Sequence, residues 1–392
     1  MDKYSLDDIS KFIRNGASIK QFDNAKGYPI TRIETIANFR IDLDRVGYAD
    51  IFELSKYEDY LLKKGDILMS HINSEKHLGK SAIVENDDNK IIHGMNLLCI
   101  RVDEKLIVPK FLNYYFNHHK FKNKLPKITK KSVNQASFSV TDLKNIEIEV
   151  PDIDIQTRTV EVLDKAQELI EKRKEQIEAL DELVKSRFIE MFGDPVTNPK
   201  GWEKRKLADE CNIITGNTPS RKVEEYYGDY IEWIKSDNIT NAGVYLTTAR
   251  ECLSEKGLNV GRSVEPNSIL MTCIAGSLKC IGNVAIADRK VAFNQQINGI
   301  ETLDNNVFFM FEQFNLSQAY IQSTINMALK GILSKSQLSE LEFIFPPIEL
   351  QNEFANFFKQ VDKLKLEMEN SLKDLEDNFN SLMQKAFKGE LF

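Results

Sequence analysis

The sequence predicts an α+β protein that consists of two similar globular units, each followed by one long helix. Three observations support this fold class. The chain repeats itself, two segments carry apolar residues at every seventh position, and the other segments alternate short β-branched runs with turn residues. A chain of 392 residues also exceeds the length that one hydrophobic core usually organises. We expect residues 1–151 and 193–346 to be the globular units, and residues 152–192 and 347–392 to be the helices.

The repeat is visible in four pairs of segments, one of which aligns IIHGMNLLCI (91–100) with VAFNQQINGI (291–300). GDILMSHIN (65–73) matches NSILMTCIA (267–275), and HLGKSAIV (77–84) matches CIGNVAIA (280–287). FSVTDLKNIEIEVPDIDIQ (138–156) matches LSKSQLSELEFIFPPIELQ (333–351) at a constant offset of 195 residues, which then holds without a gap to the end of both helices. Such a chain can fold with an internal pseudo-twofold symmetry.

Each globular unit is expected to mix short strands with one or two short helices. In the first unit, β-branched and apolar runs predict four strands and an aromatic run predicts a helix. The expected strands are Ile67–Met69, Ala82–Val84, Leu97–Val102 and Ile146–Val150, and the expected helix is Lys110–His118.

HLGKS (77–81) resembles the end of a nucleotide-binding loop. Such a loop needs a glycine where Ser74 stands, because consecutive backbone N–H groups must face the phosphates. The second copy has Asn283 and Val284 in place of the lysine and the hydroxyl residue. Only the glycine is shared, so the segment is predicted to be a turn between strands.

The two helices carry an apolar seam that is sustained for five heptads, which is typical of a coiled coil. Pro151 and Pro346-Pro347 mark the helix starts, and Gly193 follows the end of the first helix. We expect the two helices to pair antiparallel. The seam residues are Leu163, Ile170, Ile177, Val184 and Met191 in the first helix, and Phe354, Val361, Met368, Leu375 and Leu382 in the second.

Charge and composition indicate a cytoplasmic protein with one basic surface. The net charge is −7, yet residues 1–151 carry 24 basic and 21 acidic side chains, and residues 105–141 hold eight lysines and no acid. The sequence shows neither an apolar run of membrane-spanning length nor the charge pattern of a signal peptide. The five cysteines form no CxxC pair, which predicts reduced thiols.

Five motifs resemble the specificity subunits of type I restriction–modification systems. They are SRFIEMFGDPVTNPKGW (186–202), ITGNTPSRKVEEYYGDYIEWIKSDNI (214–239), AFNQQI (292–297), LSKSQLSELEFIFPPIELQ (333–351) and QKAFKGELF (384–392), and the resemblance covers essentially the whole chain. The first unit departs from the pattern: it has GYPITRIETI (27–36) where the second has EWIKSDNI, and HGMNLL (93–98) in place of FNQQI.

The resemblance implies a DNA-reading subunit that carries no chemistry of its own. Each unit would read one half of a bipartite, asymmetric target in double-stranded DNA, and the helices would set the gap. Two adenine-N6 methyltransferase subunits and two ATP-driven translocase/nuclease subunits would be its partners, with no membrane involved. S-adenosylmethionine, ATP and Mg²⁺ would belong to those partners, so no cofactor or metal is expected in this chain.

The residues themselves also indicate no catalysis. An amino-methyltransferase needs an Asn/Asp-Pro-Pro-aromatic loop, whereas Phe345 precedes the only Pro-Pro pair and Ile348 follows it. All five histidines lie in the first unit, so no histidine mechanism is duplicated. His118 and His119 are expected to face solvent or phosphate rather than a metal.

Candidate DNA contacts combine lysines that can neutralise phosphates with amides and hydroxyls that can read base edges. The alternative for each lysine is a solvated loop, and for Asn294 a turn cap. In the first unit the candidates are Arg32, His71, Lys76, Lys80, Lys120, Lys122, Lys124, Lys127, Lys130, Lys131, Asn134 and Gln135. In the second they are Thr218, Ser220, Arg221, Lys222, Lys235, Ser236, Asp237, Ser277, Lys279, Asn294, Gln295 and Gln296.

Two other functions fit the sequence less well. One is the recognition subunit of a related bipartite system, whose partner combines methylation and cleavage in one chain. The other is a coiled-coil scaffolding protein with no role in nucleic-acid binding. A duplication with divergent units favours recognition over scaffolding.

Overall fold

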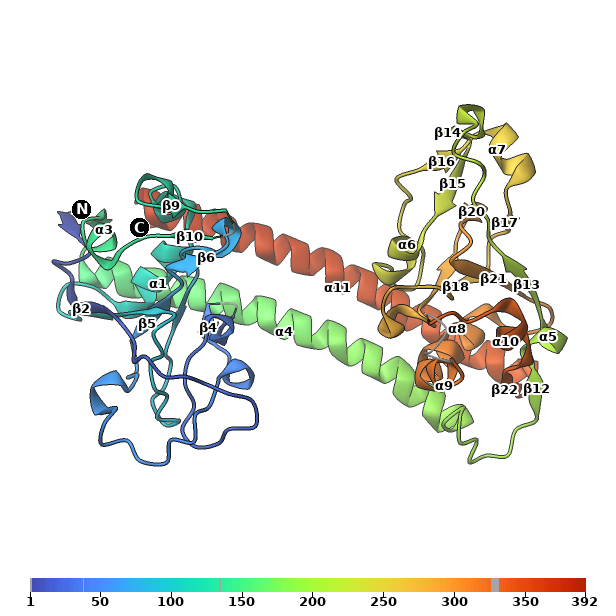
Figure 1. The fold of residues 1–392 in the computed structure, drawn as a ribbon, viewed down its shortest axis with the longest axis horizontal. Helices are drawn as coiled ribbons and strands as arrows, with labels where there is room; N and C mark the ends of the chain where they lie inside the picture. Colours follow the sequence, from blue (N-terminus) through green and yellow to red (C-terminus); the bar gives the residue numbers. More distant parts are fainter. Residues whose placement is uncertain (1, 38, 134, 326–330) are drawn as a thin grey trace. The chain divides into compact units, whose positions relative to one another are not determined.

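The computed structural model describes residues 2–37, 39–133, 135–325 and 331–392 (Figure 1). The chain forms two compact units. Unit 1 comprises Met1–Lys172 and Leu372–Phe392, and unit 2 comprises Arg173–Ser371. Each unit therefore contains one globular part together with half of each long helix. The expected division of the chain into two globular units and two separate helices stays a prediction, because each compact unit contains part of both long helices.

Unit 1 is built on a six-stranded mixed sheet in which all neighbours are antiparallel except β4 and β7. Its order is β2 (Ser10–Asn15), β8 (Leu98–Val102), β5 (Ile67–Met69), β7 (Ser81–Ile83), β4 (Arg40–Ile41) and β3 (Ile36–Ala37). Two small sheets flank it, β1 (Asp2–Ser5) with β11 (Glu147–Val150), and β6 (Ile72–Asn73) with β10 (Ala136–Ser137) and β9 (Lys130–Lys131). The α-helices are α1 (Pro109–Asn117), α2 (His119–Lys122) and α3 (Val140–Lys144), and the 3-10 helices are η1 (Ile33–Thr35), η2 (Leu43–Arg45), η3 (Glu58–Tyr60), η4 (Glu75–His77) and η5 (Leu125–Lys127).

Unit 2 contains a four-stranded antiparallel sheet and a five-stranded mixed sheet. The first has the order β13 (Cys211–Thr215), β21 (Ile297–Thr302), β18 (Ser268–Thr272) and β19 (Val284–Ala287), and the second has β14 (Tyr227–Gly228), β16 (Cys252–Leu253), β15 (Ile231–Ile234), β20 (Val291–Phe293) and β17 (Ser263–Val264). β12 (Lys204–Lys206) pairs with β22 (Glu342–Ile344). The helices are α5 (Leu207–Glu210), α6 (Ser236–Thr240), α7 (Glu255–Val260), α8 (Val307–Leu316), α9 (Gln318–Ser323), α10 (Lys335–Glu340), η6 (Glu224–Tyr226) and η7 (Leu278–Cys280).

The internal repeat is a structural repeat. The strand order β2-β8-β5-β7 in unit 1 corresponds to β13-β21-β18-β19 in unit 2, and the pair β1–β11 corresponds to β12–β22. Gly79 and Gly282 both have a positive φ, +70° and +84°, in the turn between equivalent strands. A Cβ on Gly79 would lie 2.3 Å from a Leu125 methyl group, so the turn needs glycine for both conformation and space. HLGKS is a turn, as predicted.

The long helices are α4 (Ile153–Phe192) and α11 (Ile348–Lys388). A buried glutamine at an equivalent position fastens the start of each. Gln156 donates to the carbonyl oxygens of Pro151 (2.7 Å) and Leu106 (3.1 Å) and accepts from the backbone N–H of Val108. Gln351 likewise donates to the Pro346 carbonyl (2.8 Å) and accepts from the backbone N–H of Asn306.

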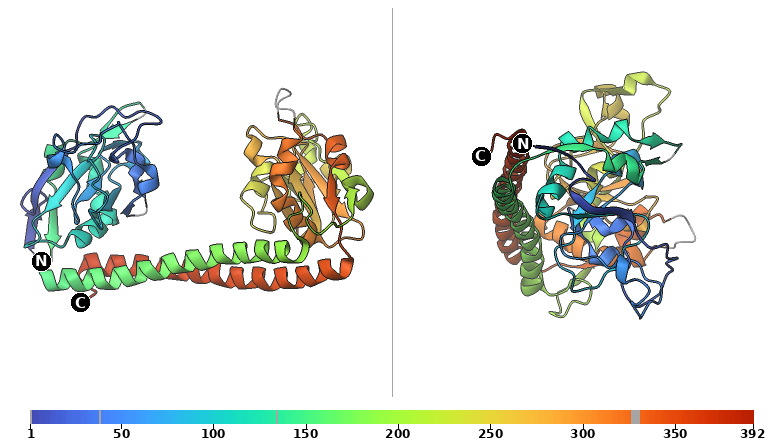
Figure 2. Two further views of the ribbon diagram at one scale, coloured as in Figure 1. Left: turned by 90° about the horizontal axis from the view of Figure 1, so that it is seen from below. Right: turned by 90° about the vertical axis from the view of Figure 1, so that its left-hand side faces the viewer.

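Within each unit the two helices lie side by side in opposite directions (Figure 2). In unit 1, Leu163 and Ile170 near the start of α4 share a core cluster with Phe379 and Met383 near the end of α11. In unit 2 the end of α4 meets the start of α11: Arg187 pairs with Glu353 at 2.9 Å. The predicted antiparallel pairing is therefore present in each unit.

The seam residues do more than join the helices. Leu163, Ile170, Val184, Phe354 and Val361 are buried in clusters that also include the globular part of their unit. The other seam residues are partly buried: Ile177, Met191, Met368, Leu375 and Leu382. The helix pair thus forms one wall of each core.

Candidate nucleic-acid interface

Three lysines of the basic segment hold unit 1 together. Lys120 donates to the carbonyl oxygen of Phe387 at 2.6 Å, which fixes α2 to the end of α11. Lys122 donates to the Gly79 carbonyl of the turn, and Lys124 to the Glu147 carbonyl of β11. Burial, and the charge of nearby Lys80, lower the pKa of Lys122 to about 8. These ammonium groups are already occupied by backbone acceptors.

The remaining lysines form an exposed basic edge. β9 pairs with β10, β10 pairs with β6, and η4 follows β6, so these elements lie together, as the labels of the three strands show in Figure 1. Lys131 reaches Glu75 of η4 at 2.7 Å. The exposed candidates on this edge are Lys76, Lys80, Lys127, Lys130, Lys131 and Gln135, while Asn134 lies outside the described residues.

Two histidines are buried, contrary to expectation. His71, predicted as a DNA contact, packs edge-on against Phe138 and is only 6% exposed, and desolvation lowers its pKa. His118, predicted to face solvent or phosphate, packs against the Phe387 ring. Their apolar neighbours explain both errors, because imidazoles next to aromatic residues complete the core. Neither side chain is available to phosphate.

A charged and aromatic cluster gathers the candidates of unit 2. Glu251 accepts from Arg221 and from Lys235, each at 2.7 Å. The Arg221 guanidinium lies over the rings of Tyr227 (4.5 Å) and Trp233 (5.2 Å). Candidates around the cluster with exposed side chains are Thr218, Ser220, Lys222 and Gln295.

Some unit 2 candidates have structural roles instead. The Asn294 side chain is buried, and its oxygen accepts from the Gln296 backbone N–H at 3.0 Å, so the turn-cap alternative is the observed one. Asp237 lies in the first turn of α6 and is exposed, where its negative charge would repel a phosphate. Ser236 is partly exposed beside it, Gln296 is partly exposed, and Ser277 and Lys279 are exposed at η7.

Four neighbours of the candidate residues were not themselves predicted as contacts. Gln21, Tyr227, Trp233 and Glu251 contact the predicted candidates, but they lie up to 30 residues away along the chain. Of these four, Tyr227 and Trp233 lie inside a family motif, residues 214–239. A search for polar residues at equivalent positions of the repeat would have found Gln21.

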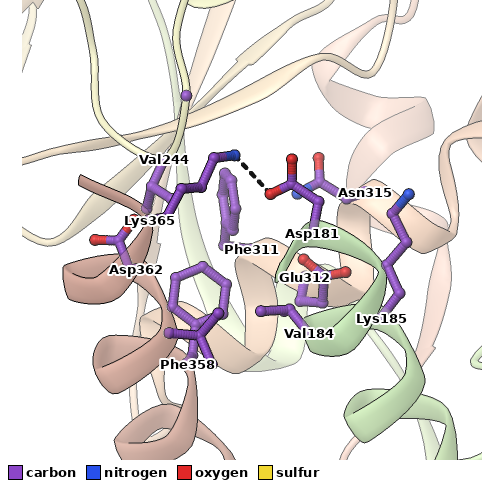
Figure 3. A pocket seen from close by; sticks show the side chains of 12 residues that line it. Asp181, Val184, Lys185, Val244, Phe311, Glu312, Asn315, Phe358, Asp362 and Lys365 are labelled. Carbon is purple, nitrogen blue, oxygen red and sulfur yellow. Dashed lines mark hydrogen bonds and ion pairs between the residues drawn. The ribbon is translucent and has the colours of Figure 1, made fainter. Parts of the chain in front are cut away.

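Unit 2 also contains a cavity of about 350 Å³ between α4, α8 and α11 (Figure 3). Glu312 of α8 is buried in its wall, and desolvation raises the pKa of this carboxyl to about 7. Phe358 and Val184 line the apolar side, and Lys365 pairs with Asp181 at 2.5 Å. The cavity shares no lining residue with the charged cluster.

The described residues offer no sign of a metal site: they contain no group of three His, Cys, Asp or Glu side chains that could hold an ion. Among the same residues, no helix is both long and apolar enough to cross a membrane.

Comparison with known proteins decides the family. A model of the type I restriction modification DNA specificity domain matches residues 1–179 and again residues 199–376. The chain belongs to this family. The double match also corresponds to the repeat, since each copy covers one globular part and most of one helix. As a member, this specificity subunit recognises DNA, and catalysis lies in partner subunits.

Relatives and solved structures agree with this assignment. The specificity subunit is 32% identical over 381 residues to a protein of Methanocaldococcus jannaschii assigned as the MjaX specificity subunit, covering 92% of this chain and 86% of that one. It is 30% identical over 202 residues to the HindI specificity subunit of Haemophilus influenzae, covering 49% and 42%. An S subunit from M. genitalium has the same fold, with a TM-score of 0.58 at 15% identity over 98% of this chain and 96% of that one. A chain from a type I R-M assembly gives 0.60 at 16% identity over 100% and 98%.

Proposed function

We propose that unit 1 and unit 2 each read one half of an interrupted, asymmetric DNA target, with the helices setting the gap. The observation that carries this proposal is the repeated backbone frame with different polar side chains on it. A shared frame supports the same type of docking, and different side chains select different bases. The subunit would thereby do with one chain what a dimeric repressor does with two half-sites.

The contacts are proposed from exposure and charge. In unit 1 the basic edge binds phosphates, because its lysines are exposed and line neighbouring short elements. In unit 2 the cluster around Arg221 combines donors, an acceptor and aromatic faces, which suits base edges better than phosphates alone. The residues proposed to contact DNA are Arg32, Lys76, Lys80, Lys127, Lys130, Lys131 and Gln135 in unit 1, and Thr218, Ser220, Arg221, Lys222, Lys235, Ser277, Lys279 and Gln295 in unit 2.

The partners follow from family membership. We propose a cytoplasmic complex with two adenine methyltransferase subunits, one for each half-site, and two translocase/nuclease subunits. The twofold repeat supports the number two, because each copy offers an equivalent docking frame.

The test is methylation mapping in a host without its own adenine methylation. Co-expression with the methyltransferase subunit should produce modified adenines in one interrupted motif with two different halves. Neither protein expressed alone should modify DNA. Methylation by this chain alone, or by the partner at the same motif without it, would contradict the proposal.

A further inference from the structure

The internal repeat provides two versions of one surface in a single chain. In unit 1, Ile30 pairs with Ile92 in parallel, and in unit 2 Trp233 pairs with Ala292 in parallel. Two residues further along, Arg32 and Lys235 each begin a short helix. The backbone N–H of Arg32 donates to Thr35 Oγ1 at 2.8 Å, and that of Lys235 donates to Asn238 Oδ1 at 3.0 Å. Arg32 and Lys235 are therefore equivalent positions.

A second pair of equivalent positions lies beside the first. The backbone N–H of Ala17 donates to the His93 carbonyl at 2.8 Å, and that of Asn217 donates to the Phe293 carbonyl at 3.1 Å. Four residues later the chain reaches Gln21 in unit 1 and Arg221 in unit 2. The frame is the same, but the side chains differ.

The chemistry on this frame differs between the units. In unit 1, Arg32 Nε donates to Gln21 Oε1 at 2.6 Å. In unit 2, the two positions carry Arg221 and Lys235, and Glu251 bridges them. These positions are partly or fully exposed, and they interact directly in unit 1 and through Glu251 in unit 2. Because their chemistry differs between the units, they are where half-site selectivity is expected to reside.

Arg221 is held in place on three sides. Glu251 accepts from Nη2, and the guanidinium lies over Tyr227 and Trp233. These rings are themselves fixed to the loop that carries Arg221: the Tyr227 hydroxyl donates to the Pro219 carbonyl at 2.7 Å, and Trp233 Nε1 donates to the Asn217 carbonyl at 3.3 Å. The Arg221 side chain remains 56% exposed.

We propose that Arg221 reads a guanine in the half-site of unit 2, and that Glu251 is its positioning residue. Among the described residues only Nη2 of the guanidinium has an acceptor, so other N–H groups of the fork can reach O6 and N7 of guanine. Glu251 fixes the fork and offsets one of two neighbouring positive charges, which limits attraction to unrelated DNA. This inference rests on the proposed function, because it assumes that unit 2 contacts base edges.

A phosphate contact would behave differently from a base contact. A phosphate-binding arginine contributes equally on every sequence, whereas a guanine-reading arginine contributes only where N7 is present. Replacing guanine by 7-deazaguanine, which lacks N7, removes one acceptor without changing base pairing. If Arg221 reads guanine, the effects of 7-deazaguanine and Arg221→Gln on affinity are not additive. If Arg221 binds a phosphate, the two effects add independently.

The experiment measures binding of the specificity subunit, in complex with its methyltransferase subunit, to its mapped target. Each guanine of both half-sites is replaced in turn by 7-deazaguanine. At one guanine, 7-deazaguanine should lower the affinity of the wild-type complex by roughly 5- to 150-fold. At the same guanine it should leave the affinity of the Arg221→Gln complex unchanged. Arg221→Lys should resemble Arg221→Gln, because lysine keeps the charge without the fork. Lys256→Gln, which removes another exposed cation of unit 2, is the matched control and should respond as wild type does.

The Glu251→Gln variant provides a second test, in which affinity is measured both for the target and for unrelated DNA. It should raise affinity for unrelated DNA, because one negative charge is lost, while it lowers the preference for the target. The proposal would be overturned if, at every guanine of both half-sites, 7-deazaguanine weakened wild type and Arg221→Gln to the same extent. It would also be overturned if Arg221→Gln weakened binding to all sequences equally. A wild-type complex that shows no sequence preference at all would instead contradict the proposed function itself.

Discussion

At the scale of single residues, lysines of the same basic segment have different structural roles. Lys120, Lys122 and Lys124 donate to backbone carbonyl oxygens and connect α2 and the residues that follow it to neighbouring segments. Lys127 and Lys130, a few residues further along, are exposed and have no such acceptor among the described residues. Sequence alone could predict that the segment is basic, but not which ammonium groups the fold occupies.

The exposed lysines should determine the salt dependence of DNA binding. The triple variant Lys76→Ala, Lys127→Ala, Lys130→Ala should weaken binding on all sequences about equally. It should lower the slope of log affinity against log salt by about 0.9 for each phosphate contact removed. Titrations at several salt concentrations measure this. The charge-matched control is Lys11→Ala, Lys64→Ala, Lys90→Ala, and equal slopes for the two triple variants would show that the basic edge is merely solvated.

Glu312 should make unit 2 less stable as the pH rises. Its folded pKa of about 7 lies above the ordinary 4.5, so its contribution to stability is full below pH 4.5 and is lost as pH rises through 7. The charged groups around it are Asp181, Glu182 and Lys185 on α4 and Asp362 and Lys365 on α11. Glu312→Gln should therefore stabilise unit 2 by on the order of 2 kcal/mol at pH 8.

The measurement is thermal unfolding at pH 4 and pH 8. The Glu312→Gln variant should exceed wild type at pH 8 and match it at pH 4, whereas the exposed Glu178→Gln control should match wild type at both. A Glu312→Gln variant that is less stable at pH 8 would mean that the carboxylate makes a favourable interaction there.

At the scale of elements, the long helices, the central strands β8, β5 and β7 of the first sheet, and β11 were predictable, whereas the other short strands of unit 1 were not. The heptad spacing of the long helices depends only on local sequence. The predicted strand Ile67–Met69 is identical to β5. The expected helix Lys110–His118 corresponds to α1, which begins and ends one residue earlier. β9 and β10 have two residues each and exist through pairing with distant chain. Strands of two residues are too short to show the alternation of apolar and polar residues by which a strand is predicted.

The helix starts depend on one buried glutamine each. Gln351→Ala should destabilise unit 2 by about 1–3 kcal/mol, because buried polar groups at Pro346, Asn305 and Asn306 lose their partner. Gln156→Ala should do the same in unit 1. Chemical denaturation measures both, with exposed Gln360→Ala of α11 as control. Stabilities equal to the control would show that water replaces these hydrogen bonds at no cost.

At the scale of the whole molecule, one backbone frame is used twice. The frame explains why one chain can serve two different half-sites, and the polar pairs Gln21–Arg32 and Arg221–Lys235 show where the two copies diverge. Family membership could be predicted from motifs at the helix ends. Target bases could not, because the side chains proposed to select them, such as Arg221 with Glu251, differ from their counterparts in the other copy.

We propose that the long helices act as a ruler that sets the distance between the half-sites. The seam residues repeat every seven positions, so one added heptad keeps the stripe in register. It lengthens a helix by about 10.5 Å, close to three base pairs at about 3.4 Å each. A four-residue insertion should instead break the stripe and lower stability.

The most direct test inserts one heptad into both helices, after Ile177 and after Leu372. Methylation by the reconstituted complex is then measured on a DNA library with randomised gap length. We predict unchanged bases in each half-site together with a longer preferred gap, or loss of binding if the added rotation of one unit around the duplex cannot be accommodated. A lengthened variant that still prefers the parental gap would contradict the account and assign the spacing to the partner subunits.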